Sequence, residues 1–476
     1  MGIQEIGLLI LVSALLGWVT RRWQRKNSLL AVSVVAIYWL QPQLPLRYLD
    51  FWLPTVTLVV AIFSWLITAK EEERSKPTAV HTFVLITGLV LLLSISRYLD
   101  LGGVLDFIHP PQIYQVLIVW ALVGGVFLGF IRWRKSSNLL LWGAFAGLLV
   151  VFVVIKTPQL AEAASALWRR MMGQSTSLAG ADQIRWLGFS YLAFRMLHTI
   201  RDRQAGRLDG YTLRDYLIYL LFFPAITAGP IDRAEHFIPA LNELDGRYRD
   251  DLAAGGMRVV SGLFKKFVIA DSLSLIALGP QNALQVETPL GAWLLLYAYA
   301  FQIFLDFSGY TDLVIGMGQF MNIRLPENFQ RPYRQPNLTQ FWNNWHITLT
   351  QWFRSYFFYP LSRALRRQRK YSAFIILLIT QVSTMVLVGL WHGVTFNFVL
   401  WGLWHGMGLL VQNRWSAWAR PVLSSWREKP AFENALSVLG AVATFHYVAL
   451  GWIWFVIPEP ALGWQFFSRL WGGLGL

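Results

Sequence analysis

Apolar runs separated by short polar connections make up the first third of the chain. A helix that crosses a membrane needs about 20 mainly apolar residues. Six runs follow this pattern in the first part of the sequence, near residues 4–20, 28–41, 51–68, 78–95, 113–131 and 139–155. The pattern predicts that residues 1–155 form transmembrane helices.

The apolar pattern becomes less regular in residues 156–476. An amphipathic helix is expected around 161–172, and the apolar runs that follow it contain polar or helix-breaking residues. These residues are Pro224, Gly229, Pro230, Lys265, Lys266 and Asp306. Broken helices with polar inserts persist at membrane depth only where they are buried in protein or line a wet cavity. We therefore expect residues 156–476 to form the core of the same bundle, around a central tunnel.

The last third of the chain returns to longer apolar runs. They lie near 372–390, 394–411 and 435–457, and a short helix is expected at 461–474. Together with the earlier runs, they bring the expected total to about ten to twelve spans. The predicted fold class is all-α, a polytopic transmembrane helical bundle with broken or tilted helices.

The composition agrees with a membrane protein. Hydrophobic residues make up 55% of the chain and charged residues 14%, whereas soluble domains carry about 25% charged residues. The 24 tryptophans suit the two membrane–water interfaces, where this side chain is enriched. The chain has no cysteine, which excludes disulfides, cysteine–zinc sites and a thiol nucleophile.

The net charge of +15 would suggest nucleic acid as a partner in a soluble chain. Here the basic residues cluster between apolar runs, so we expect a lipid bilayer and no nucleic acid. The connections after the first, third and fifth runs are basic, with Arg21, Arg22, Arg25 and Lys26, then Lys70, Arg74 and Lys76, then Arg132, Arg134 and Lys135. Basic loops stay in the cytoplasm. The pattern predicts a multi-pass protein of the cell membrane with an extracytoplasmic N-terminus.

Three histidines in the last third of the chain are candidates for chemistry. His392 and His405 lie in residues 371–411, which contain no charged side chain. Burying a polar group without a partner costs several kcal/mol, so ionisable residues within spans usually face a bundle interior or a cavity. The pattern also allows a structural role for His392, bonded to a neighbouring carbonyl. For His405 it allows a packing role.

His346 lies in a segment rich in tryptophan. On one continuous helix, His346 would border an apolar face formed by Trp342, Trp345, Leu349 and Trp352. An amphipathic helix lying in the membrane interface has the same pattern. Neutral imidazole can take a proton from a hydroxyl, and desolvation favours the neutral form. The pattern alone leaves a structural, an interfacial and a catalytic role open.

Other kinds of site are less well supported by the sequence. Asp306 and Asp312 lack a tight ligand spacing with the histidines, so we expect no metal site. The segment that contains them, "DFSGYTD" around Gly309, is expected to be a helix-capping turn. No segment resembles a phosphate-binding loop. A transporter with a histidine proton relay stays open, because broken helices and buried polar residues also describe transporters.

Five motifs resemble those of the bacterial membrane-bound O-acyltransferases. They are "GLFKKFVIAD" (262–271), "DFSGYTDLVIGMG" (306–318), "RLPENFQRPY" (324–333), "FWNNWHITLTQWFRSYFFYPL" (341–361) and "GLWHG" (389–393). The resemblance covers about residues 185–411 and rests on all five motifs in order. It implies a multi-span bundle with a tunnel, in which an acyl group moves from a thioester to a hydroxyl.

The resemblance also implies roles for two residues. The near-invariant family histidine corresponds to His392, the expected general base, and a second family histidine corresponds to His346. His346 would bind or polarise the reacting groups, or line the donor path. Thr348 stands where many relatives have serine, a departure that leaves the histidine in place. No tightly bound cofactor is implied, because the acyl thioester is a substrate.

Two branches of the family fit the sequence. The motifs at 262–271 and 341–361 look like alginate-type O-acetyltransferases of exported polysaccharides, which would use acetyl-coenzyme A. Those at 190–202 and 220–233 look closer to D-alanyl transfer proteins of teichoic acid, which would use an acyl carrier protein. We favour acetylation of an extracytoplasmic, cell-wall polysaccharide or of a relay protein. An extracytoplasmic acyltransferase or acceptor protein would be the partner, and a scaffolding subunit without catalysis is a further alternative.

Overall fold

The computed structural model describes residues 2–19, 25–99, 109–132, 138–243, 248–422 and 429–473. Within these ranges the regular elements are helices, and the one β-type contact is an isolated antiparallel bridge between Phe329 and Trp345. The chain divides into two compact units, which are described separately below. Unit 1 contains residues 1–259 and 314–325, and unit 2 contains residues 260–313 and 326–476.

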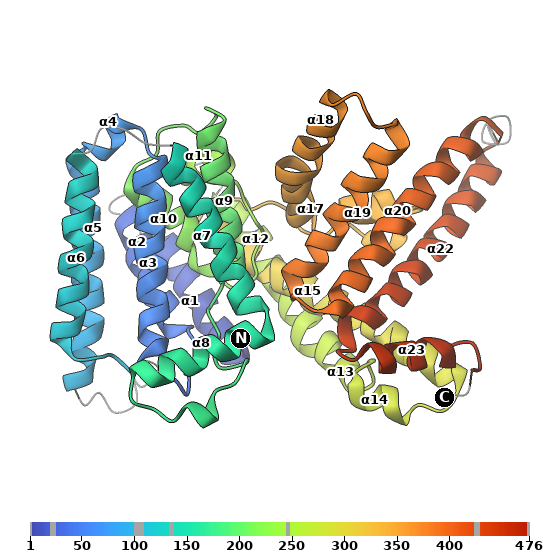
Figure 1. Ribbon diagram of the computed structural model, residues 1–476, viewed down its shortest axis with the longest axis horizontal. Coiled ribbons are helices and arrows are strands. Elements are labelled where there is room, and N and C mark those ends of the chain that lie inside the picture. The colour runs from blue at the N-terminus through green and yellow to red at the C-terminus, as the bar shows by residue number, and fades with distance from the viewer. Residues whose placement is uncertain are drawn as a thin grey trace. The chain divides into compact units, whose positions relative to one another are not determined.

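Unit 1 is built from the N-terminal helices, drawn in blue to green in Figure 1. Its helices are α1 (Ile3–Val19), α2 (Arg25–Trp39), α3 (Leu49–Thr68), α4 (Glu71–Arg74), α5 (Pro77–Ile95), α6 (Ile113–Arg132), α7 (Asn138–Lys156), α8 (Pro158–Met171), α9 (Phe189–Gln204), α10 (Leu213–Leu221), α11 (Ala234–Asn242) and most of α12 (Tyr248–Leu263), with 3₁₀ turns at Ser96–Tyr98, Thr176–Leu178 and Phe223–Ala225. The last residues of α15 (Pro289–Phe320) also belong to this unit.

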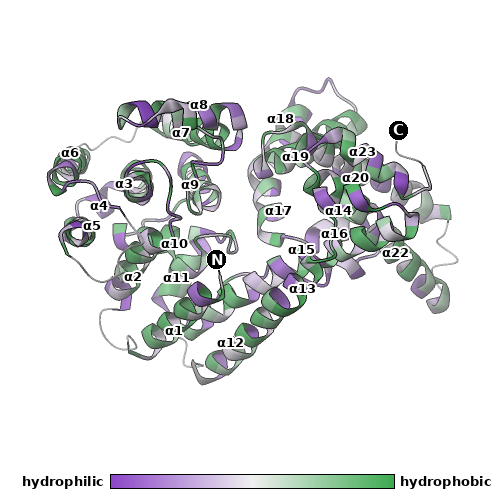
Figure 2. Cartoon of the chain, turned by 90° about the horizontal axis from the view of Figure 1, so that it is seen from below, coloured by the Kyte–Doolittle hydropathy of each residue, from purple (hydrophilic) through white to green (hydrophobic). Residues whose placement is uncertain are grey.

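Unit 2 carries the later motifs. It contains a π-helical segment (Phe264–Ala270), α13 (Asp271–Ser274), α14 (Pro280–Gln285), most of α15, a 3₁₀ turn (Pro332–Arg334), α16 (Leu338–Asn344), α17 (Ile347–Phe353), a second π-helical segment (Arg354–Phe358), α18 (Tyr359–Arg367), α19 (Ala373–His392), α20 (Phe396–Val422), α22 (Pro430–Val456) and α23 (Pro460–Arg469). Figure 1 shows α19, α20 and α22 side by side in orange and red. Figure 2 shows apolar and polar residues on these helices, and α15, α19 and α22 are the long apolar ones.

The core of unit 1 centres on α3, whose side chains are mostly buried. Hydroxyl groups link α3 to its neighbours inside this core. The Tyr38 hydroxyl lies 2.8 Å from Thr55 Oγ1, and the Tyr216 hydroxyl lies 2.8 Å from Ser64 Oγ. Hydrogen bonds of this kind join helices where water is absent. Unit 1 therefore combines apolar packing with hydrogen bonds between hydroxyl groups of neighbouring helices.

Seven helices in the described ranges are long and apolar enough to cross a membrane: α3, α5, α6, α7, α15, α19 and α22. Helix α1 is a shorter apolar helix of 17 residues. The prediction of an all-α, polytopic membrane fold is confirmed, and the larger expected count includes short runs such as 28–41. The basic residues Arg21, Arg22, Arg134 and Lys135 lie outside the described residues. The domain boundary expected at residue 155 stays a prediction.

The helical breaks predicted in the middle of the chain are only partly observed. Helix α10 does end before Pro224, as expected from a residue that lacks a backbone N–H. In contrast, α15 continues through Asp306 and Gly309 without a break, so the capping turn predicted there is wrong. A Cβ at Gly309 would lie 2.9 Å from the Gly262 carbonyl oxygen. This glycine serves close helix packing and is not a chain reversal.

Candidate functional site

His392 is the last residue of α19, in the "GLWHG" motif. The two glycines of this motif allow α20 to begin very close to it. A Cβ at Gly389 would lie 2.1 Å from the Phe398 carbonyl oxygen, and one at Gly393 would lie 2.8 Å from the Phe398 ring. The glycines therefore place the first turn of α20 against the histidine.

Aromatic rings surround the half-buried imidazole of His392. Its ring centroid lies 4.5 Å from that of Trp391, 4.7 Å from Phe455 and 5.7 Å from Trp401. Phe398 is stacked on the imidazole at 5.8 Å. These rings come from α19, α20 and α22, so the environment of His392 exists only when the three helices are packed together.

His346 lies at a break between two short helices. Helix α16 ends at Asn344, α17 begins at Ile347, and His346 adopts a left-handed conformation with φ of 42° and ψ of 54°. The predicted continuous helix through this segment is therefore wrong. Non-glycine residues rarely occupy this conformation, which is found disproportionately at functional sites.

Asn328 holds the chain just after His346. Its backbone carbonyl accepts a hydrogen bond from the Ile347 N–H at 3.0 Å. Its side-chain Oδ1 accepts one from the Thr348 N–H at 3.2 Å and one from the Thr348 hydroxyl at 2.7 Å. Asn328 is fully buried. These long-range bonds compete with helical bonds and explain why the local helix pattern failed here.

The structure brings both His346 and His392 into contact with the same tryptophan, Trp391. The Trp391 centroid lies 5.8 Å from that of His346 and 4.5 Å from that of His392. The two imidazoles cannot be farther apart than the sum of these distances. His346 is 3% exposed. The apolar face formed by Trp342, Trp345, Leu349 and Trp352 therefore lies in the protein interior and does not belong to an interfacial helix.

Helix α15 supplies the opposite wall at His346. The Phe307 ring meets the imidazole edge to face at 4.7 Å. Next to Phe307, Asp306 forms an ion pair with Lys266, and Asp312 pairs with Lys265 at 2.6 Å. The lysines of "GLFKK" thus neutralise the two carboxylates of "DFSGYTD". This pairing gives the two carboxylates a structural role in the packing of the π-helical segment against α15.

His405 occupies a different place, deeper in α20. It is 0% exposed, and neither ring nitrogen has a hydrogen-bond partner among the described residues. Its ring lies 4.8 Å from Trp401 and 5.1 Å from Trp342. Trp401 also contacts His392, so this tryptophan packs against both histidines.

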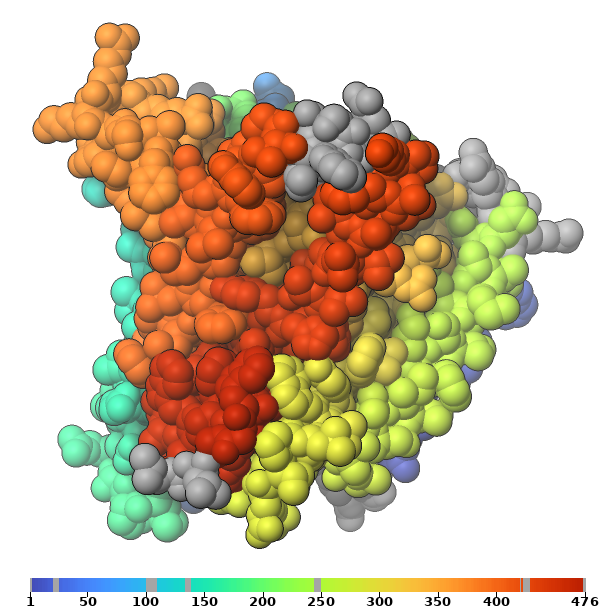
Figure 3. All heavy atoms as spheres, turned by 90° about the vertical axis from the view of Figure 1, so that its right-hand side faces the viewer, coloured from blue at the N-terminus to red at the C-terminus, as the bar shows by residue number. Residues whose placement is uncertain are grey.

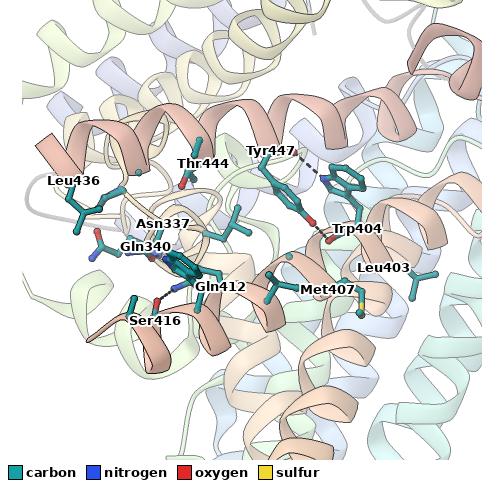
Figure 4. A pocket seen from close by; sticks show the side chains of 18 of the residues that line it. Asn337, Gln340, Leu403, Trp404, Met407, Gln412, Ser416, Leu436, Thr444 and Tyr447 are labelled. Carbon is teal, nitrogen blue, oxygen red and sulfur yellow. Dashed lines mark hydrogen bonds between the residues drawn. The ribbon is translucent and has the colours of Figure 1, made fainter. Parts of the chain in front are cut away.

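A groove between α20 and α22 lies apart from these histidines. It has a volume of about 1090 Å³ and is lined largely by apolar side chains, with Gln412 and Ser416 bonded to each other at 2.9 Å near one end. Figure 4 shows Trp404 and Tyr447 exchanging hydrogen bonds across it. Neither His346 nor His392 lines this groove, so its size does not identify it as the reaction site.

The described part of the chain contains no group of three or more histidines and carboxylates that could hold a metal ion. An imidazole in an aromatic enclosure can act as a base for a hydroxyl once water is excluded. Sequence reasoning identified both histidines but missed Asn328, Phe307 and Trp391, which position them. The "DFSG", "PENF" and "LWH" letters of the motifs contained these residues without revealing their contacts.

The chain belongs to the membrane-bound O-acyltransferase (MBOAT) family, because the family model matches residues 140–454. It is therefore an acyltransferase and a multi-pass membrane protein. This assignment supports the enzyme over the transporter expected as an alternative.

Several bacterial proteins are similar to this chain. The probable alginate O-acetylase AlgI of Pseudomonas aeruginosa is 33% identical over 60% of this chain and 51% of its own length. The teichoic acid D-alanyltransferase of Bacillus subtilis is 28% identical over 76% of this chain and 87% of its own length. The peptidoglycan O-acetyltransferase of Helicobacter pylori is 33% identical over 51% of this chain and 43% of its own length. The chain thus aligns with about half the length of the acetylating relatives.

Proposed function

We propose that this protein moves an acetyl group from a cytoplasmic thioester to a hydroxyl of an extracytoplasmic polysaccharide or of a relay protein. The observation that supports the proposal is that two motif histidines both pack against Trp391. They are 46 positions apart in the sequence numbering and come from different helical elements. A purely structural need would not require both rings at one tryptophan.

His392 is the proposed general base. It takes the proton of the acceptor hydroxyl while that oxygen bonds to the thioester carbonyl carbon. The carbon–sulfur bond then breaks, and the departing thiolate receives the proton. A base of this kind contributes about 10²–10⁴-fold, and holding the two substrates together supplies much of the rest. His346, which also packs against Trp391, binds or polarises the reacting carbonyl.

The donor side is proposed to lie at α18. The segment 363–370 contains five basic residues and no acidic one, and these side chains are exposed: Arg363, Arg366, Arg367, Arg369 and Lys370. Basic connections face the cytoplasm, so this segment and the N-terminal pattern predict an extracytoplasmic N-terminus in a cell membrane. The phosphates of acetyl-coenzyme A, or an acidic carrier protein, suit such a surface.

A second candidate function is D-alanyl transfer to a teichoic acid-type polymer from an acyl carrier protein. The D-alanyltransferase of Bacillus subtilis favours this candidate, because it aligns over 87% of its own length. The reaction step at His392 is the same in both cases. The donor, the acceptor and the partner proteins distinguish them.

The test uses the purified full-length protein in lipid nanodiscs. Acetyl-coenzyme A and D-alanyl carrier protein are supplied separately, and loss of each thioester is measured with and without an acceptor polysaccharide. We expect acetyl-coenzyme A to be consumed by the wild type and not by His392→Ala. The exposed histidine variant His236→Ala serves as the control and should match the wild type. Equal turnover by wild type and His392→Ala would overturn the mechanism, and turnover of the carrier protein alone would select the second candidate.

A further inference from the structure

A second groove of unit 2 lies between α15 and α22, on the other side of α22 from the one in Figure 4. Its volume is about 830 Å³. One part of its wall is aromatic and aliphatic, with Phe301, Phe304, Tyr333, Val442 and Phe445 among its residues. The other part carries two arginines, Arg331 and Arg334. The groove therefore has an apolar body and a cationic end.

The helices on both sides of this groove are candidate membrane spans. Large apolar side chains on them point outward: Phe301 is 44% exposed, Val438 63% and Val442 51%. In a bilayer, exposed apolar surface of this kind faces lipid chains. In Figure 3, which faces unit 2, gold residues of the segment after α15 reach the surface beside red α22. The groove is thus open to lipid.

The loop that carries the arginines is held rigidly. Tyr333, which lies between them, donates a hydrogen bond to the Ala300 carbonyl at 2.8 Å and accepts one from Trp452 Nε1 at 3.2 Å. Arg331 has a left-handed backbone with φ of 47°, and its carbonyl accepts a bond from the Gln335 side chain at 3.2 Å. The inward anchor at Tyr333 leaves both guanidinium groups on the outer surface.

The charge of this loop is not balanced by the protein. No ion pair joins Arg331 or Arg334 to a carboxylate in the described ranges, and no acidic residue lines the groove there. An arginine at the centre of a bilayer costs about 2.5–3.5 kcal/mol on insertion scales, whereas an arginine near the headgroups attracts anionic lipid by about 1 kcal/mol. Arginine forms bidentate hydrogen bonds with phosphate, and its planar fork suits that partner better than lysine does. A phosphate would therefore complete the site.

We propose that this groove binds one anionic phospholipid. Its phosphate lies between Arg331 and Arg334, and an acyl chain follows the aromatic and aliphatic wall along α22. A lipid with a net negative headgroup fits better than a zwitterionic one, because the described lining offers no carboxylate to an ammonium group. The bridge that pairs Phe329 with Trp345 connects this loop to the segment of His346. The bound lipid stabilises the part of the chain that positions the second histidine.

The test is native mass spectrometry of the full-length, delipidated protein titrated with phosphatidylglycerol or with phosphatidylcholine of the same acyl chains. We expect phosphatidylglycerol to bind wild type at least about tenfold more tightly. The double variant R331Q/R334Q should lose this preference. The control R170Q/R185Q removes the same charge from exposed arginines of unit 1 and should keep it. Ala441→Trp fills the groove without changing charge and should also weaken binding about tenfold.

Several outcomes would overturn the proposal. Equal binding of both lipids, or equal loss in the control, would mean that bulk charge alone attracts the lipid. Competition by inorganic phosphate without any effect of Ala441→Trp would indicate a free-anion site in place of a lipid site. A dimer mass that R331Q/R334Q abolishes would mean that a second copy of the chain covers the groove. If the double variant does not fold, Ala441→Trp and R331K/R334K decide the result.

Discussion

Histidines are buried in both units, but their surroundings differ. In unit 1, His198 is 1% exposed, and its Nε2 accepts a hydrogen bond from the Ala234 N–H at 3.3 Å. The Tyr219 hydroxyl is close to the same ring, at 3.4 Å. In unit 2, aromatic rings from several helices pack against His346 and His392.

The difference contrasts a polar cluster that stabilises unit 1 with the aromatic surroundings of the proposed reaction site. Beside His198, the guanidinium of Arg195 donates to the carbonyls of Tyr219, Leu220 and Pro230, which closes the end of α10 and the turn after it. These bonds satisfy groups that would be costly to bury alone. In unit 2, the aromatic rings around His346 and His392 keep water from the imidazoles, as the proposed reaction requires.

Among the tests that compare the histidines of the two units, the largest change in activity is expected from replacing His346. We expect His346→Gln to lower kcat by about 10²-fold, because a positioned imidazole is lost from the reacting groups. The melting temperature of the protein in detergent should change little. Thioester consumption per folded protein measures the first quantity and thermal denaturation the second. A large fall in melting temperature with normal kcat would place His346 with His198 as a structural residue.

The opposite result is expected at His198. His198→Phe leaves the Ala234 N–H without its acceptor and should lower the free energy of unfolding by about 1–3 kcal/mol. Turnover per folded protein should stay close to that of the wild type. Denaturation in a mild detergent, together with the thioester assay, separates the two effects. A specific loss of turnover would mean that the unit 1 cluster takes part in the reaction.

Asn328 tests how the backbone positions His346. Asn328→Ala removes the acceptor of both Thr348 bonds and should lower kcat by about tenfold, since small displacements of a catalytic group are costly. Asn328→Asp retains the acceptor oxygens and should keep more of the activity. The ratio of the two kcat values is the measurement. Equal losses would show that the hydrogen bonds to Thr348 do not position the histidine.

Replacing His405 should change stability and activity very little. Replacing a buried polar group that makes no hydrogen bond by an apolar group of similar shape is close to neutral, and the surrounding rings already favour an aromatic side chain. We expect His405→Phe to change the free energy of unfolding by less than about 1 kcal/mol. Activity should stay within a few fold. A loss as large as that of His346→Gln would add His405 to the site.

The smallest effect concerns pH. A hydrogen bond with Asp232 raises the pKa of His236 above 6.5, against the opposing effect of partial burial. The stabilisation is fully present below the unfolded pKa of 6.5 and is lost as pH rises through the raised folded value. Because the ring is half exposed, it contributes only about a few tenths of a kcal/mol. Melting curves of wild type and His236→Asn should converge at alkaline pH, and a constant difference would contradict the expected linkage.

The sequence by itself determined the helical membrane class, most helix positions and the family. These features depend on local hydropathy and on motif letters, which short segments carry on their own. The pattern also identified His346 and His392, because a titratable ring is conspicuous in an apolar run. It did not reveal the left-handed break at His346 or the uninterrupted course of α15.

Only the tertiary structure decided those points. His346 leaves the helix because Asn328, eighteen positions earlier, bonds to the residues that follow it. Asp306 is tolerated inside α15 because Lys266 neutralises it. Trp391 contacts both His346 and His392 because segments distant in sequence pack together. Such contacts depend on the whole fold, and no local pattern of residues specifies them.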